Sequence, residues 1–182
     1  MDGHAQEGHG RRDARARGVV SLSGVVAVVR RLVACAVLAA GVVAAPAAAP
    51  DAVPDVPLVD LGGRPIDLRQ ARATELIFVA AWCEPCGRAL TAARRRAGAL
   101  RRQGYRTVVV GVGTRESADA FARWARGYGF GDALVFDRDG RIEAAFGAEY
   151  LPWHVVIAGG RVVHRGDRAP GLEELRRWLA GG

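Results

Sequence analysis

Two cysteines separated by two residues are the part of this chain best suited to chemistry. Cys83 and Cys86 stand in the run Trp82-Cys83-Glu84-Pro85-Cys86, between an apolar stretch and an arginine-rich stretch with helical periodicity. A helix that begins at this motif would direct its unpaired N–H groups and its positive dipole end toward the first sulfur. Cys83 is therefore predicted to be the attacking thiolate, and Cys86, one turn further in, to resolve the mixed disulfide. Pro85 suits this early helical position because its missing N–H would have no partner there.

A zinc site is the alternative for a pair of cysteines at this spacing. It would need two more ligands, but the chain has no second cysteine pair. The four histidines do not have a metal-ligand spacing: they are His4, His9, His154 and His164. The sequence thus favours redox chemistry, with no metal and no cofactor beyond the Cys83–Cys86 disulfide itself.

The length and charge of the chain limit the classes of function. Its 182 residues allow one ordinary domain with an N-terminal extension. All 26 basic residues are arginine, and after residue 50 there are 20 arginines against 16 acidic residues. These arginines are scattered among acids, and the cluster Arg94-Arg95-Arg96 with Arg101-Arg102 is expected mostly on the solvated face of a helix. We therefore expect no nucleic-acid partner.

The first fifty residues are typical of a targeting leader, which leaves residues 51–182 as the folded domain. Arg30-Arg31 precede an apolar stretch of 14 residues, Leu32 to Ala45, which is shorter than the ~20 residues of a membrane-spanning helix. Cleavage near Ala45-Pro46-Ala47 is the leading hypothesis, and an uncleaved membrane anchor is the alternative. Either outcome predicts a location outside the cytoplasm, in the periplasm or cell envelope.

Cys35 lies inside this leader, in the run Leu32-Val33-Ala34-Cys35, which resembles a lipoprotein acylation box. The arginines stand directly before it and the apolar run follows it, the reverse of the usual order. Cys35 is therefore expected to leave with the leader, so that Cys83 and Cys86 are the only cysteines of the exported domain.

Hydrophobic periodicity predicts alternating strands and helices after residue 70. Continuous apolar runs predict buried strands over 75–80 and 107–112, and the helix expected between them, 86–103, implies a parallel, right-handed crossover. The remaining predicted elements are a short hairpin over 58–61 and 66–68, a helix over 116–128, a strand over 133–136, a short helix over 142–146, antiparallel strands over 154–158 and 161–164, and a helix over 172–179. These elements predict an α/β fold with a mixed sheet and helices on both faces.

This pattern resembles the thioredoxin fold, and within it the TlpA/ResA-like group of exported thiol–disulfide oxidoreductases. The resemblance covers Pro54 to the end of the chain. It rests on Ala81 to Cys86, on Asp137-Arg138-Asp139-Gly140 followed by Phe146-Gly147, and on Leu151-Pro152. It implies that Pro152 is cis and lies against the disulfide, and that the backbone of Leu151 pairs with a bound substrate strand.

The resemblance also implies the partners and the direction of the reaction. Members of the group often keep the cysteines of apocytochrome c reduced for haem attachment, and they receive electrons from a membrane thiol carrier. We therefore expect the chain to reduce disulfides in exported proteins, with apocytochrome c as a candidate substrate.

Three positions depart from the family pattern. Ile77 stands where thioredoxins carry a buried aspartate, Ala89 where many TlpA-like proteins carry a glutamate, and Thr91 where relatives have a helix-kinking proline. No carboxylate is therefore assigned to accept the proton of Cys86. Glu75 is expected at the surface, as a strand-end charge, and a substitute proton acceptor is the alternative.

The side chains around the motif have two interpretations each. Trp82 would shield the site or be a core aromatic, and Trp153 would contact the substrate or be a plain edge residue. His154 would lower the pKa of the thiolate if it faces the sulfurs, or else serve in packing or lie at the surface. Glu84 would disfavour the thiolate by like charge or be solvated and inert.

Three other functions remain open from the residues alone. A copper- or haem-handling chaperone would use the dithiol with His154 as ligands. A thioredoxin-like interaction module would have vestigial thiols, since both relay carboxylates are missing. A peroxidase is less well supported, because no Pro/Thr-rich loop precedes Cys83.

Overall fold

The computed structural model describes residues 52–181. The predicted leader, with its cleavage site and Cys35, lies outside these residues and stays a prediction. Within residues 52–181, no helix combines the length and the apolar character that crossing a membrane requires.

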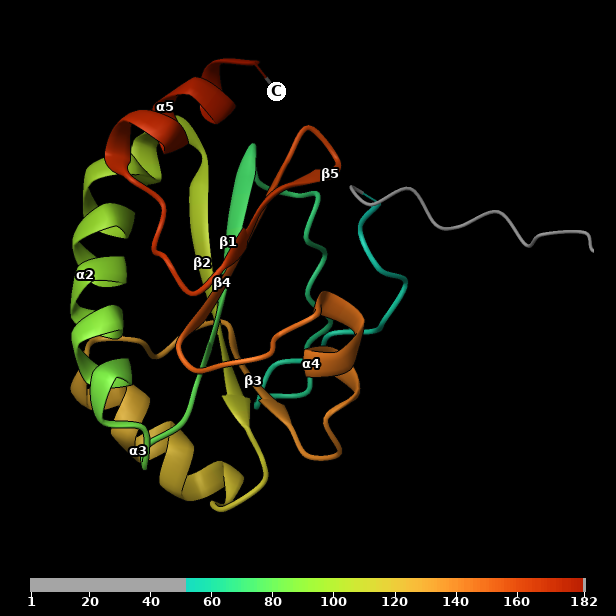
Figure 1. Ribbon diagram of the computed structural model, residues 1–182, viewed down its shortest axis with the longest axis vertical. Helices are drawn as coiled ribbons and strands as arrows, with labels where there is room; N and C mark the ends of the chain where they lie inside the picture. The colour runs from blue at the N-terminus through green and yellow to red at the C-terminus, as the bar shows by residue number, and fades with distance from the viewer. Residues whose placement is uncertain (1–51, 182) are drawn as a thin grey trace, which may run out of the picture. The chain divides into compact units, whose positions relative to one another are not determined.

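A mixed sheet of five strands forms the centre of the domain (Figure 1), as predicted. Its order is β3-β2-β1-β4-β5, with β1, β2 and β3 parallel to one another and β4 antiparallel to both β1 and β5. The strands are β1 (Ala73–Val79), β2 (Tyr105–Val112), β3 (Leu134–Asp137), β4 (Trp153–Ala158) and β5 (Arg161–Gly166).

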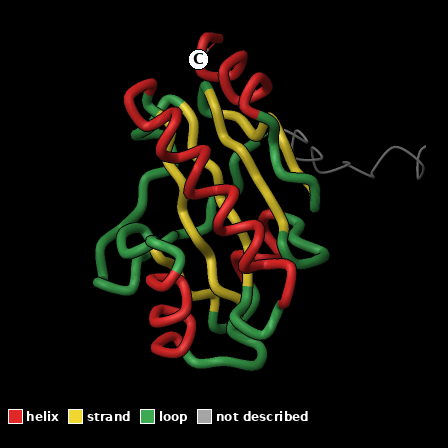
Figure 2. The backbone as a smooth tube through the Cα atoms, turned by 90° about the vertical axis from the view of Figure 1, so that its left-hand side faces the viewer, coloured by secondary structure: helices red, strands yellow, loops and turns green. Residues whose placement is uncertain are grey.

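Helices cover both faces of this sheet, which confirms the predicted α/β architecture. They are α2 (Glu84–Leu100), extended by a 3-10 turn at Arg101–Gln103, α3 (Ala118–Gly127), α4 (Arg141–Phe146) and α5 (Leu172–Gly181). Helices α2 and α3 share one core cluster and α5 another on the same face, while α4 packs on the opposite face. Figure 2 shows α2 running across the sheet from the side that it covers.

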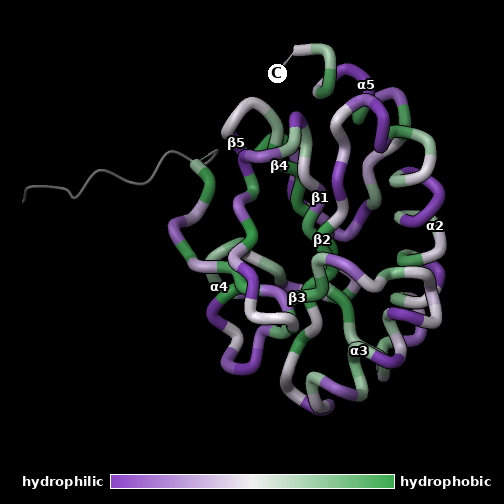
Figure 3. The backbone as a smooth tube through the Cα atoms, turned by 180° about the vertical axis from the view of Figure 1, so that it is seen from behind, coloured by the Kyte–Doolittle hydropathy of each residue, from purple (hydrophilic) through white to green (hydrophobic). Residues whose placement is uncertain are grey.

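Strand β1 lies between β2 and β4, and all seven of its residues are buried. Because side chains alternate across a strand, Ile77 and Val79 contact the α2 and α3 cluster, whereas Leu76 and Phe78 contact the α4 cluster. The apolar colouring in Figure 3 concentrates in these central strands, and polar residues recur along α2. Strand β1 therefore carries the chain to Cys83 through the buried centre of the sheet.

The structure corrects the predicted start of the helix over 116–128. Ser117 is the N-cap residue, and its hydroxyl accepts a hydrogen bond from the backbone N–H of Ala120 at 3.3 Å. Helix α3 therefore begins at Ala118, so that Glu116 lies in the loop between β2 and α3. The loop position allows the Glu116 side chain to reach a neighbouring segment.

The predicted hairpin before residue 70 is reduced to a single bridge between Val59 and Pro65. Two backbone hydrogen bonds flank this bridge: the N–H of Asp60 donates to the carbonyl of Arg64 at 2.9 Å, and that of Ile66 donates to the carbonyl of Leu58 at 2.8 Å. The Asp60 carboxylate also accepts the N–H groups of Gly62 and Arg64, at 2.8 and 2.9 Å, which closes a tight turn. Asp60 then bridges to Val135 at the β3 edge of the sheet.

Candidate redox site

The two cysteines form a disulfide at the start of α2, with their Cα atoms 5.4 Å apart. Cys83 is the N-cap residue, and the backbone N–H of Cys86 donates to its carbonyl oxygen at 3.0 Å. Cys83 is 7% exposed and Cys86 is fully buried. The sulfur that was predicted to attack is therefore the more accessible of the two.

The N-terminus of α2 provides the electrostatic setting for Cys83. No side chain caps the helix there, and Pro85 occupies the first turn, where its missing N–H has no consequence. The remaining N–H groups and the positive end of the helix dipole favour a negative charge on an N-cap sulfur.

A hollow of about 540 Å³ opens at Cys83. Its walls include two aromatic side chains, Trp82 and Tyr150, and the apolar side chain of Leu151. The peptide bond between Leu151 and Pro152 is cis, as the family resemblance implied. The structure thus brings the predicted residues Trp82, Leu151 and Pro152 to the same end of the sheet as the disulfide.

Trp82 is 46% exposed, so it is a surface aromatic beside the disulfide and not part of the core. The guanidinium carbon of Arg115 lies 5.1 Å from the centroid of the Trp82 ring, within cation–π distance. This contact joins the loop between β2 and α3 to the motif.

Trp153 is not among the described residues that line the hollow. It begins β4 opposite Phe78 and packs against the core cluster on the α4 face. Its ring lies 6.3 Å from that of Tyr150, and its Nε1 is buried without a hydrogen-bond partner. Tyr150, which the sequence analysis did not select, is 65% exposed and lines the hollow in its place.

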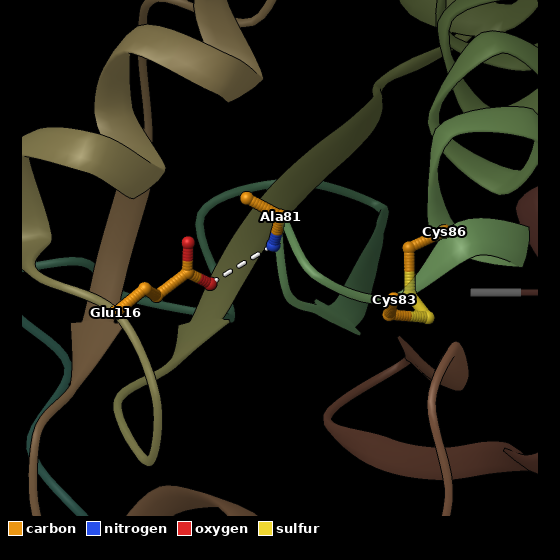
Figure 4. Close-up of a disulfide and its surroundings, with 4 residues drawn as sticks. All are labelled: Ala81, Cys83, Cys86 and Glu116. Atoms are coloured by element: carbon orange, nitrogen blue, oxygen red, sulfur yellow. Dashed lines mark hydrogen bonds between the residues drawn. A yellow bond between two sulfur atoms is a disulfide. The ribbon is translucent and has the colours of Figure 1, made fainter.

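Glu116 is a second residue that the sequence analysis did not assign to the site. Its Oε1 accepts a hydrogen bond from the backbone N–H of Ala81 at 2.9 Å, two residues before Cys83. Figure 4 shows the Glu116 carboxylate pointing to Ala81. In this view Ala81 lies between Glu116 and the disulfide. Its Oε2 is buried without a partner, and burial raises the pKa of Glu116 despite the Ala81 hydrogen bond. The helix predicted over 116–128 places Glu116 in its first turn, whereas the structure places it in the preceding loop.

Glu75 is completely buried, so its expected place at the surface is wrong. Its Oε1 accepts hydrogen bonds from Arg96 Nη2 at 2.7 Å and from His154 Nδ1 at 2.8 Å, and its Oε2 accepts one from the Tyr105 hydroxyl. Burial alone would raise the pKa of Glu75, but the His154 hydrogen bond and the Arg96 charge hold it below its ordinary value. These contacts compensate for the loss of hydration and allow a carboxylate in the core.

The partners of Glu75 are buried with it. Arg96 is an exception to the expected solvated arginine face of α2, because its side chain is only 9% exposed. Burial and the negative charge of Glu75 raise the pKa of Tyr105 well above its ordinary value. His154 is 1% exposed and its Nδ1 contacts Glu75, which agrees with the interpretation of His154 as a packing residue. Its role in lowering the pKa of the Cys83 thiol stays a prediction.

Residues 52–181 contain no group of three or more histidine, cysteine, aspartate or glutamate side chains that could hold a metal ion.

Glu84 is largely solvated, and its Oε1 lies 3.1 Å from Nη1 of Arg88, one turn later in α2. Two further acids line the hollow with it, Glu143 and Glu149, neither of which the sequence analysis selected. Burial, and then the neighbouring Asp137, raises the pKa of Glu143. These acids come from the segment around α4, which is far from Cys83 in the sequence.

Comparisons with known proteins agree with this geometry. The family model described as "AhpC/TSA family" matches residues 49–165. No curated protein sequence matches the chain.

Many solved structures share the fold. A secreted disulfide oxidoreductase of Mycobacterium tuberculosis, homologous to E. coli DsbE, is 21% identical with a TM-score of 0.54, and the match covers 69% of this chain and 95% of that one. A thiol:disulfide interchange protein from Chlorobium tepidum TLS is 20% identical with a TM-score of 0.59, covering 74% and 97%. StoA from Bacillus subtilis is 17% identical with a TM-score of 0.56, covering 68% and 94%. These matches confirm the thioredoxin fold.

Proposed function

The chain belongs to the AhpC/TSA family, and we propose that it exchanges thiols and disulfides with exported proteins through Cys83 and Cys86. One observation carries the proposal. The disulfide of Cys83 and buried Cys86 lies at an uncapped helix N-terminus and opens on a hollow shared with Leu151. Among the structurally similar proteins are a disulfide oxidoreductase and a thiol:disulfide interchange protein.

In the proposed reaction, the reduced chain transfers two electrons to a substrate disulfide. The Cys83 thiolate attacks one substrate sulfur, the substrate S–S bond breaks, and the first substrate thiolate leaves and takes a proton from solvent. Cys86 then loses its proton and attacks the Cys83 sulfur. The second substrate thiolate leaves, and the Cys83–Cys86 disulfide closes.

We propose the reducing direction, outside the cytoplasm, with apocytochrome c as a candidate substrate and a membrane thiol carrier as the donor that regenerates the dithiol. The resemblance to the TlpA/ResA-like group supports this choice. The exchange needs no cofactor beyond the two cysteines.

Trapping the mixed disulfide tests the exchange. The Cys86→Ala variant of the whole chain retains the attacking sulfur but lacks the resolving one. It should accumulate adducts with envelope proteins that migrate as larger species on non-reducing gels and disappear with dithiothreitol.

The Cys83→Ala variant is the matched control and should form far fewer adducts, because buried Cys86 is the less accessible sulfur. If Cys86→Ala forms no adducts, or if the two variants trap equally, the assignment of Cys83 as the attacking group is wrong. A complete absence of adducts would favour a non-catalytic interaction module.

A further inference from the structure

We propose that the hollow at Cys83 selects partner segments that carry lysine or arginine close to their reactive cysteine. This inference rests on the thiol–disulfide exchange proposed above and adds the class of substrate. The occupant is an extended, positively charged segment of another exported protein.

Charge is distributed unevenly around the disulfide. Glu84, Glu143 and Glu149 line the hollow, and none of the described residues in its walls is basic. The chain as a whole has the opposite balance, since arginines outnumber acids after residue 50. An acidic wall at the reactive sulfur is therefore a local property of this surface.

Two of these acids lack a positive partner. Neither Glu143 nor Glu149 forms an ion pair within residues 52–181. Glu143 is half-buried beside Asp137, and both burial and this like charge raise its pKa. A cation from a partner would relieve this repulsion, which the chain's own arginines leave uncompensated.

Two arginines that contact residues of the hollow, Arg88 and Arg115, leave room for a partner's cation. Arg88 pairs with Glu84, but both side chains are highly exposed, at 74% and 88%, and such pairs exchange readily because water screens them. Arg115 lies over the Trp82 ring and lines a different hollow, together with Glu116.

The apolar part of the hollow suits the stem of a basic side chain. Trp82, Tyr150 and Leu151 can contact the methylene groups of lysine or arginine while the charged end reaches the glutamates. The Trp82 ring already accepts the guanidinium of Arg115 from within the chain. Tyr150 offers a second exposed ring.

A second hollow, of about 590 Å³ near the other end of α2, has the opposite character. Arg94, Arg101 and Arg106 line it, with Asp132 as the single acid among the described residues in its wall. The arginines of this second hollow repel an approaching cation, and the glutamates of the hollow at Cys83 attract it. A positively charged segment is therefore steered toward Cys83.

Small disulfides of different charge provide the direct test. The reduced whole chain would be mixed with cystamine (two positive charges), bis(2-hydroxyethyl) disulfide (neutral) or 3,3′-dithiodipropionate (two negative charges). Cys83 displaces one thiolate from the probe and Cys86 displaces the other, so each probe is reduced by two electrons. Each second-order rate constant would be divided by that of dithiothreitol with the same probe, which cancels the intrinsic reactivity of the probe.

The normalised rate for cystamine should exceed that for 3,3′-dithiodipropionate by about tenfold at low salt. The ratio should fall toward one at about 1 M salt, where the screening length is only about 3 Å. The double variant Glu143→Gln/Glu149→Gln should lower the ratio at least about threefold. The double variant Asp167→Asn/Glu173→Gln removes the same two charges at exposed sites outside the hollow, so it is the matched control and should leave the ratio unchanged.

Two peptide disulfides extend the test to a chain segment. They differ only in arginine or glutamate two residues from the cysteine, and the arginine peptide should react faster. A wild-type ratio near one, or a ratio that the double variant leaves unchanged while the neutral probe still reacts, would overturn the charge selection and leave the exchange function intact. If the reduced chain reduces none of the probes faster than dithiothreitol does, the proposed exchange function is wrong, and the charge selection that rests on it is wrong too.

Discussion

At the scale of single residues, the reactivity of Cys83 depends on how its neighbours hold its sulfur. The motif and the order of exposure of the two cysteines could be predicted from sequence, because two-residue spacing before a helix fixes both. Glu116 could not be predicted, since its contact with Ala81 spans 35 residues and depends on where α3 begins. Loop length and capping decide that point, and hydrophobic periodicity does not report it.

Replacement of Glu116 should show what its hydrogen bond contributes. Glu116→Ala removes the acceptor for the Ala81 N–H and should lower the free energy of unfolding by about 1 kcal/mol. Glu116→Gln retains an acceptor oxygen and should lower it less. Urea unfolding of both oxidised variants measures the difference, and equal losses would show that the hydrogen bond has no part in holding the motif.

At the scale of elements, Glu75 connects β1 to three neighbours, since Arg96 lies on α2, Tyr105 on β2 and His154 on β4. The order of strands and helices was correctly predicted because each element has its own periodicity. The burial of Glu75 was not, because its partners lie up to 79 residues away in sequence and only the assembled sheet brings them together. The sequence does contain one sign of this burial, because Glu75 is a charged residue within the mostly apolar strand β1.

Loss of the Glu75 charge should destabilise the domain strongly. Glu75→Gln leaves the Arg96 guanidinium buried without a counter-charge, and the expected loss is about 3–5 kcal/mol in the free energy of unfolding. The double variant Glu75→Leu/Arg96→Met should lose less than Glu75→Gln alone, because both charges are removed together. Denaturant titrations compare the two, and a loss under about 1 kcal/mol for Glu75→Gln would contradict a structural role.

The raised pKa of Tyr105 predicts how the free energy of unfolding changes at alkaline pH. Its pKa is raised in the folded state by burial and by Glu75, so the unfolded chain loses this proton first, near the ordinary value of 10.0. Stability should therefore fall as the pH rises above about 10, by up to about 1.4 kcal/mol per pH unit. Tyr105→Phe should remove this dependence. Parallel unfolding curves for the two proteins between pH 9 and 11 check it, and an identical decline in both would contradict it.

At the scale of the whole molecule, the direction of electron transfer depends on the relative stability of the oxidised and reduced forms. Each ~30 mV of potential corresponds to about 1.4 kcal/mol for two electrons. This difference sums contributions from the helix dipole, the surrounding charges and the packing of both cysteines, so no single motif determines it. Composition and periodicity predicted the fold, but a balance of this kind could not be predicted from them.

The proposed reducing role predicts a reduction potential near that of thioredoxin, ~−270 mV. Equilibration of the chain in redox buffers, followed by tryptophan fluorescence or thiol alkylation, measures it. A potential near ~−120 mV, that of a strong periplasmic oxidant, would reverse the proposed direction.

The proposed exchange requires a reactive sulfur at Cys83. Alkylation of the reduced chain with iodoacetamide, followed over pH and located by mass spectrometry, measures it directly. Cys83 should react first, with an apparent pKa below the ~8.5 of an ordinary cysteine thiol, and Cys86 should react much more slowly. A Cys83 that reacts no faster than a peptide thiol at neutral pH, or a Cys86 that reacts before it, would contradict the account.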